Sequence, residues 1–208
     1  MGTIKNLVFD LGGVIVDLDI DRAIERFVEI GVADAGSMMD KYHQKGIFLE
    51  IEDGRLDAEE FCNKLSTFSR KKLTLEEVQY AWLGFIKDVP QYKLDFIRGL
   101  RSQFKVYLLS NTNPLVMSWA RSNAFSRSGM PIEAYLDKVY ASYEIGLVKP
   151  DKAIFEHMIE DASLIPSETL FIDDGIANIN TANELGFHTY LAKNGMDWRN
   201  DISLMANL

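Results

Sequence analysis

Short apolar runs that end in polar residues recur along this chain. Residues 4–9 (Ile-Lys-Asn-Leu-Val-Phe) form one such run, which ends at Asp10 and the pair Gly12-Gly13 and predicts a strand followed by a turn. Similar runs predict four further strands, at residues 105–109, 138–141, 169–172 and 188–191. Runs with few polar interruptions are typical of strands that are buried on both faces of a parallel sheet.

The segments between the later strands follow a helical period. Residues 90–101 and 150–159 each begin with a proline, which is favoured in the first helical turn, and then place apolar side chains on one face. Residues 176–185 stop before Gly186, and glycine is common just after a helix ends. This alternation predicts an α/β fold with a Rossmann-like, doubly wound parallel sheet.

Residues 19–87 break the alternation, because their pattern is helical throughout. Four helices are predicted there, at residues 20–30, 35–44, 58–67 and 75–86, the last after a capping-box pattern that begins at Thr74. A helical block inserted after the first strand would cover the ligand-binding edge of the sheet as a cap. We therefore expect an α/β core domain formed by residues 1–18 and 88–208 and a helical cap domain formed by residues 19–87.

Composition narrows the functional classes. The 208 residues are 47% hydrophobic and 25% charged, as in soluble globular proteins. The net charge of −9 disfavours general binding to nucleic acid. No run approaches the roughly 20 apolar residues of a membrane-spanning helix, and the N-terminus does not resemble a secretory signal, which favours the cytoplasm. Cys62 is the single cysteine, so an internal disulfide is excluded. Nothing in the sequence fixes the oligomeric state.

Four sets of polar residues follow the predicted strands or begin a helix. They are Asp10, Ser110, Lys149 and the pair Asp173-Asp174. Each alone is typical of a turn or a helix cap. Together they would meet at the carboxyl edge of the sheet, where carboxylates can hold Mg²⁺ and a hydroxyl with backbone amides can hold phosphoryl oxygens. A lysine about 4 Å from a developing charge contributes about 4 kcal/mol before desolvation.

The same residues lie in segments that resemble the motifs of the haloacid dehalogenase-like hydrolase superfamily. Residues 8–17 (Val-Phe-Asp-Leu-Gly-Gly-Val-Ile-Val-Asp) resemble its first motif and residues 108–113 (Leu-Leu-Ser-Asn-Thr-Asn) its second. Residues 146–151 (Gly-Leu-Val-Lys-Pro-Asp) are similar to its third motif and residues 171–178 (Phe-Ile-Asp-Asp-Gly-Ile-Ala-Asn) to its fourth. The order of the motifs and the inserted helical block match members that carry a C1-type cap.

The resemblance implies a role for each principal residue. Asp10 would be the nucleophile, forming an aspartyl-phosphate, and a Mg²⁺ ligand. Ser110 would bind the transferring phosphate, and Lys149 would stabilise the charge of the nucleophile and of the phosphoryl group. Asp174 would be the main acidic metal ligand of the fourth motif, with Asp173 a further ligand or its orienting partner.

Further roles follow from the same resemblance. The backbone carbonyl of Gly12 would be a metal ligand. Gly12, Gly13 and Asn111 would contact the substrate together with Ser110 and Lys149. Asn178 stands where many members have an additional aspartate, and it can accept a hydrogen bond without adding charge.

Gly12 is the main departure from the family pattern, because most of its phosphatases have a second aspartate there as general acid and base. A missing general acid typically lowers the rate by about 10²–10⁴-fold. Three interpretations remain. The chain hydrolyses a phosphate ester with a good leaving group, and its motifs resemble those of bacterial alpha-D-glucose-1-phosphate phosphatases. It is a metal-independent 2-haloacid dehalogenase, a branch that also lacks this aspartate. Or it is a catalytically weak binding scaffold. We expect the first, with a small sugar phosphate as substrate.

Overall fold

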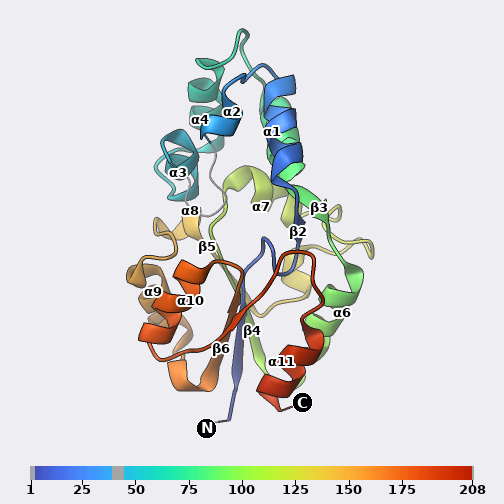
Figure 1. The fold of residues 1–208 in the computed structure, drawn as a ribbon, viewed down its shortest axis with the longest axis vertical. Coiled ribbons are helices and arrows are strands. Elements are labelled where there is room, and N and C mark those ends of the chain that lie inside the picture. Colours follow the sequence, from blue (N-terminus) through green and yellow to red (C-terminus); the bar gives the residue numbers. More distant parts are fainter. Residues whose placement is uncertain (1–2, 39–44, 208) are drawn as a thin grey trace.

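Five parallel strands form the central sheet of the computed structural model, which describes residues 3–38 and 45–207 (Figure 1). The order across the sheet is β5-β4-β1-β6-β7. The strands are β1 (Asn6–Phe9), β4 (Lys105–Ser110), β5 (Lys138–Ala141), β6 (Thr169–Asp173) and β7 (His188–Leu191). Each lies within a residue or two of its predicted position, so the predicted fold class is confirmed.

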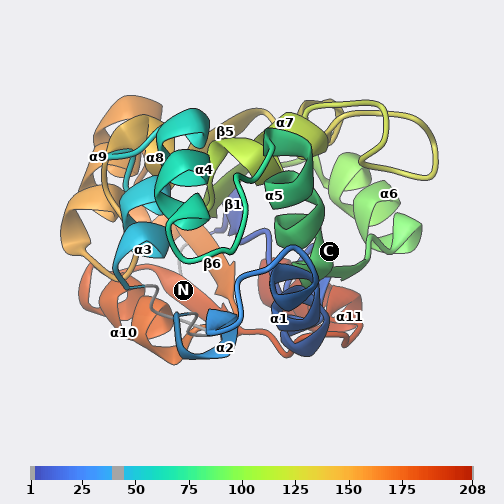
Figure 2. The ribbon, with the colours of Figure 1, turned by 90° about the horizontal axis from the view of Figure 1, so that it is seen from above.

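Helices cover both faces of the sheet, as the apolar strand sequences require. Figure 2 shows α6 (Gln91–Leu100) and α11 (Arg199–Ala206) on one side and α9 (Lys152–Ala162) and α10 (Ile176–Glu184) on the other. Alternate residues of β1 separate the two layers, because Leu7 belongs to the core under α6 and Val8 to the core under α9. Shorter elements complete this part of the chain: α7 (Pro114–Ala120), α8 (Ser142–Ile145) and the 3₁₀ turns Ile132–Ala134 and Pro166–Glu168.

A block of helices lies beyond the carboxyl edge of the sheet (Figure 1). It contains α1 (Ile20–Glu29), α2 (Ala35–Met38), α3 (Ile47–Glu52), α4 (Ala58–Ser66) and α5 (Leu75–Trp82). The helix predicted over 35–44 begins as expected, and residues 39–44 lie outside the described residues. One hydrophobic cluster runs from the sheet into this block. The division into a core (1–18 and 88–208) and a cap (19–87) stays a prediction.

One predicted helix of this block was wrong in detail. The helix expected over 75–86 ends at Trp82, and the chain continues through the 3₁₀ turn Leu83–Phe85 into β3 (Ile86–Asp88). Gly84 lets this turn pack closely against α1, because a Cβ there would lie 2.7 Å from Ala23 Cα. β3 pairs antiparallel with β2 (Asp17–Leu18), so the chain segments that enter and leave the helical block form a small sheet. The helix α3 was not predicted.

None of the helices in the described part of the chain combines the length and the apolar character needed to cross a bilayer.

Candidate active site

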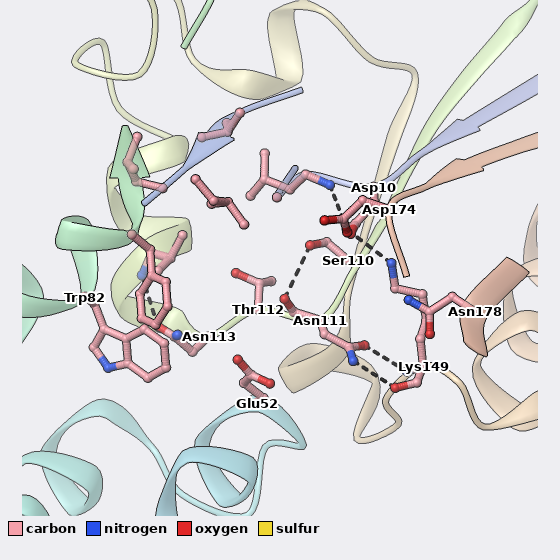
Figure 3. Close-up of a pocket in the computed structure, with 17 residues that line it drawn as sticks. Asp10, Glu52, Trp82, Ser110, Asn111, Thr112, Asn113, Lys149, Asp174 and Asn178 are labelled. Carbon is pink, nitrogen blue, oxygen red and sulfur yellow. Dashed lines mark hydrogen bonds and ion pairs between the residues drawn. The ribbon is translucent and has the colours of Figure 1, made fainter. Parts of the chain in front are cut away.

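The carboxyl ends of three adjacent strands bring the predicted acidic and hydroxyl groups together (Figure 3). Asp10 directly follows β1, Ser110 ends β4 and Asp173 ends β6. The Asp10 N–H donates to the carbonyl of Ile172 at 2.9 Å, which fixes the first strand end against the third. β1 lies at the point where the strand order reverses direction, the usual place of a ligand crevice in such sheets.

Lys149 links two of the carboxylates. Its Nζ lies 2.6 Å from Asp173 Oδ2 and 3.1 Å from Asp10 Oδ1, and its side chain is 1% exposed. Burial alone would lower the pKa of Lys149, but the charges of Asp10 and Asp173 outweigh it and raise the pKa above its ordinary value. The ammonium group is therefore charged where a phosphoryl group would need a cation.

Asn111 holds the main chain of Lys149. Its Nδ2 donates to the Lys149 carbonyl at 2.8 Å, and its Oδ1 accepts from the Lys149 N–H at 2.8 Å. The side chain was predicted to contact the substrate. In the structure both of its polar atoms bind the main chain of Lys149 and so position that lysine. Asn111 also lines the cavity, and its contact with substrate stays a prediction.

The two aspartates of the fourth motif are placed differently. Asp173 is fully buried, and its Oδ1 accepts from the Gly175 N–H at 2.7 Å and from Asn178 Nδ2 at 2.9 Å. With Oδ2 bound to Lys149, both oxygens of Asp173 have partners. Asp174 lines the cavity. Of the two roles expected for Asp173, metal ligand or orienting partner, this arrangement favours the second, with Asp174 toward a bound ion.

Asp10, Asp173 and Asp174 form a cluster that fits a hard divalent cation. Each offers a carboxylate oxygen, and these oxygens all lie within 4.8 Å of one another. Burial raises the pKa of Asp10, and the neighbouring charges of Asp173 and Asp174 add to the effect, whereas Lys149 opposes it. A cation in the cluster would compensate this repulsion and favour the ionised form that a nucleophile requires.

Two buried side chains hold the main chain of the loop that carries Gly12 and Gly13. The carbonyl of Val14 accepts from Lys93 Nζ at 3.0 Å and from Trp198 Nε1 at 2.9 Å. Lys93 is fully buried and also lies 2.8 Å from Asp17 Oδ1. Gly13 packs directly on Asp174: its φ is +72°, and a Cβ there would lie 2.3 Å from Asp174 Oδ2.

A cavity of about 150 Å³ opens above these groups, between the sheet and the helical block. Six of the eight predicted site residues line this cavity: Asp10, Gly12, Ser110, Asn111, Lys149 and Asp174. The other two, Gly13 and Asp173, are not among the lining residues. One wall of the cavity is apolar and includes Trp82, Phe85 and Ile86.

Three polar residues of the cavity, Glu52, Thr112 and Asn113, were missed as site residues. Glu52 comes from the last turn of α3, and Thr112 from the loop after β4. Phe48, Ile51 and Glu52 are all buried, and this helical spacing is the signal that would have placed a carboxyl group on an inward face. Burial, together with the charges of Asp10 and Asp53, raises the pKa of Glu52 to about 8.

Comparison with known proteins decides the family. The model of the haloacid dehalogenase-like hydrolases matches residues 4–186. The chain belongs to this hydrolase family. It is 53% identical over 204 residues to D-ribitol-5-phosphate phosphatase of Bacteroides thetaiotaomicron, which covers 98% of this chain and 99% of that protein.

Solved structures of the same family share the whole fold. A predicted haloacid dehalogenase-like hydrolase of Porphyromonas gingivalis superimposes with a TM-score of 0.95 at 46% identity, over 100% of both chains. A family member of Bacteroides thetaiotaomicron, solved with magnesium and inorganic phosphate, gives a TM-score of 0.86 at 42% identity, over 94% of this chain and 97% of that one. The predicted membership of this enzyme family is therefore confirmed.

Proposed function

We propose that this hydrolase removes phosphate from a small phosphate monoester of a sugar or sugar alcohol, with Mg²⁺ as cofactor and Asp10 as nucleophile. The observation that carries the proposal is Lys149, which joins Asp10 to Asp173 within a cluster of three carboxylates at the base of one cavity. The magnesium and inorganic phosphate bound by a relative at 42% identity support both the metal and the phosphoryl group.

Asp10, Asp174 and the carbonyl of Gly12 would hold the Mg²⁺, and Asp173 would orient this set. All three lining residues face the same cavity, and carboxylate and carbonyl oxygens are the donors that Mg²⁺ prefers. When bound, the ion polarises phosphoryl oxygens as a Lewis acid.

The chain's own residues account for two successive displacements at phosphorus. A carboxylate oxygen of Asp10 attacks the phosphorus and the bond to the ester oxygen breaks, which releases the alcohol and leaves an aspartyl-phosphate. Ser110 binds the transferring oxygens, and Lys149 balances their charge. Water then attacks the phosphorus, and the bond to Asp10 breaks to give inorganic phosphate. Because Gly12 has no side chain, the proton that the departing alcohol needs has to come from another group or from water.

Two substrates are the first to test, and a different observation favours each. The relative at 53% identity is named a D-ribitol-5-phosphate phosphatase, which favours the ester of a primary alcohol on a pentitol. The glycine at position 12 favours an ester with a better leaving group, such as glucose 1-phosphate. The 53% identity to this phosphatase extends over 98% of the chain, whereas the argument for glucose 1-phosphate rests on Gly12 alone, so D-ribitol 5-phosphate is the leading candidate.

Phosphate release from both esters, and from glucose 6-phosphate, tests the proposal in Mg²⁺ and in chelator. We expect Mg²⁺-dependent turnover and a loss of more than about 10³-fold in Asp10→Asn, because the nucleophile is removed. Full activity in chelator or in Asp10→Asn would overturn the mechanism. Metal-independent release of halide from a 2-haloacid would favour a dehalogenase, and no turnover of any ester would favour a binding scaffold.

A further inference from the structure

Thr112 presents a buried hydroxyl group to the cavity. The residue is 4% exposed, and its Oγ1 has no hydrogen-bond partner among the described residues. Its main chain is fixed by Ser142, whose Oγ accepts from the Thr112 N–H at 2.9 Å and donates to the Thr112 carbonyl at 3.1 Å. A buried hydroxyl without a partner is unfavourable, so its position calls for a polar group supplied from the cavity.

Glu52 presents a second polar group to the same cavity from the helical block. Figure 3 shows Glu52 on the side of the cavity that the helical block forms, with Thr112 next to it toward the middle of the cavity. Glu52 is 8% exposed, and no described residue hydrogen bonds to its carboxyl group. With a pKa of about 8, the carboxyl group is mostly protonated at neutral pH, so it can both donate and accept a hydrogen bond.

The surroundings indicate which part of a ligand these groups meet. Lys149 is the only cation among the lining residues that the structure describes, and it lies with Asp10, so the phosphoryl group belongs at that end. A neutral carboxyl group and a hydroxyl suit uncharged hydroxyl groups. Trp82 and Phe85 add an apolar wall against which a carbon skeleton can pack.

We propose that Glu52 and Thr112 form a specificity site that binds hydroxyl groups of the substrate's alcohol portion, so that polyhydroxylated phosphate esters are selected over plain ones. This inference rests on the proposed phosphatase function and names the residues that choose its substrate. Neither side chain takes part in the displacements at phosphorus. Removing either one affects substrates with hydroxyl groups and spares those without.

The test compares D-ribitol 5-phosphate with phenyl phosphate, which has no hydroxyl group on its alcohol portion. We expect Glu52→Leu and Thr112→Val each to lower kcat/KM for D-ribitol 5-phosphate by about 10- to 100-fold, as expected for a lost hydrogen bond to a buried partner. The same variants should change kcat/KM for phenyl phosphate by less than about threefold, and Glu52→Gln, which keeps a donor and an acceptor, should retain most activity on D-ribitol 5-phosphate.

The outcomes separate this inference from the function on which it rests. Mg²⁺-dependent turnover of phenyl phosphate by the unaltered protein establishes the phosphatase without using the specificity site. Equal losses on both esters, no loss on either, or no preference of the unaltered protein for the polyhydroxylated ester would each overturn the inference. Absence of turnover with every ester would overturn the function and the inference together. Thermal unfolding of each variant checks that its fold is intact.

Discussion

Lys149 shows how individual charges are balanced in this site. It is buried between Asp10 and Asp173, and Asn111 fixes its main chain through two hydrogen bonds. Breaking a buried ion pair typically costs about 3–5 kcal/mol. The sequence predicted Lys149 and its two carboxylates because strand ends and a helix start meet at one edge. It could not predict that Asn111 holds Lys149, since this contact depends on how the loop after β4 packs against the loop before α9.

Glu52 makes the stability of the protein depend on pH. Its pKa is about 8 in the folded protein, against an ordinary value of 4.5, because of burial and the charges of Asp10 and Asp53. Between these two values folding takes up a proton, so the contribution of Glu52 to stability falls as the pH rises. We expect Glu52→Gln to remove this dependence, so that the variant gains stability relative to the unaltered protein as the pH rises from about 4.5 to 8.

Urea unfolding at a series of pH values measures this difference. The free energies of unfolding of the two proteins should diverge through the interval and run parallel outside it. A constant difference from pH 4.5 to 8 would contradict the raised pKa.

The loop between β1 and β2 is the element that shapes the base of the cavity. Lys93 and Trp198 both bind the carbonyl of Val14, and Gly13 lies against the carboxylate of Asp174. Hydrophobic pattern predicted the strands and long helices well, because each has several apolar positions in phase. It missed β2 and α3, since elements of 2 and 6 residues contain too few positions to reveal a period.

Gly13→Ala tests the contact between this loop and Asp174. A Cβ would lie 2.3 Å from Asp174 Oδ2, so the carboxylate has to move, and we expect kcat/KM to fall by at least about 10²-fold with weaker Mg²⁺ binding. Gly129→Ala is the matched control, because Gly129 has a φ of +71° with no atom within 4 Å of a Cβ. Both variants should lose about 1–2 kcal/mol of stability from the left-handed backbone.

Steady-state kinetics and unfolding of the two variants give the comparison. Equal activity of Gly13→Ala and Gly129→Ala would show that the position of Asp174 does not depend on Gly13.

At the scale of the whole molecule, one sheet edge supplies the chemistry and the helical block supplies the rest of the cavity. Three strand ends bring together residues as far apart as Asp10 and Asp174, and the sequence predicted this because parallel strands share one carboxyl edge. The block contributes Glu52 and Trp82. Their place in the cavity could not be predicted, since it depends on how the block packs on the sheet.

Magnesium binding should stabilise the folded molecule as a whole, because the three carboxylates are brought together only in the folded state. At a concentration 100 times Kd, a bound ion adds about 2.7 kcal/mol, which raises the Tm of a protein of this size by roughly 5–10 °C. Thermal unfolding with Mg²⁺ and with chelator measures the shift. Asp174→Asn should strongly reduce the rise in Tm that Mg²⁺ causes. A rise as large as that of the unaltered protein would show that the ion does not bind at Asp174.

The stereochemical course at phosphorus tests the central claim most directly. Hydrolysis of a thiophosphate ester whose phosphorus carries sulfur and two different oxygen isotopes, in water of the third isotope, reports the number of displacements, whether or not an intermediate accumulates. Two in-line displacements, first by Asp10 and then by water, predict retention of configuration in the inorganic thiophosphate released. Inversion would show that water attacks the ester directly, and Asp10 would then not be the nucleophile.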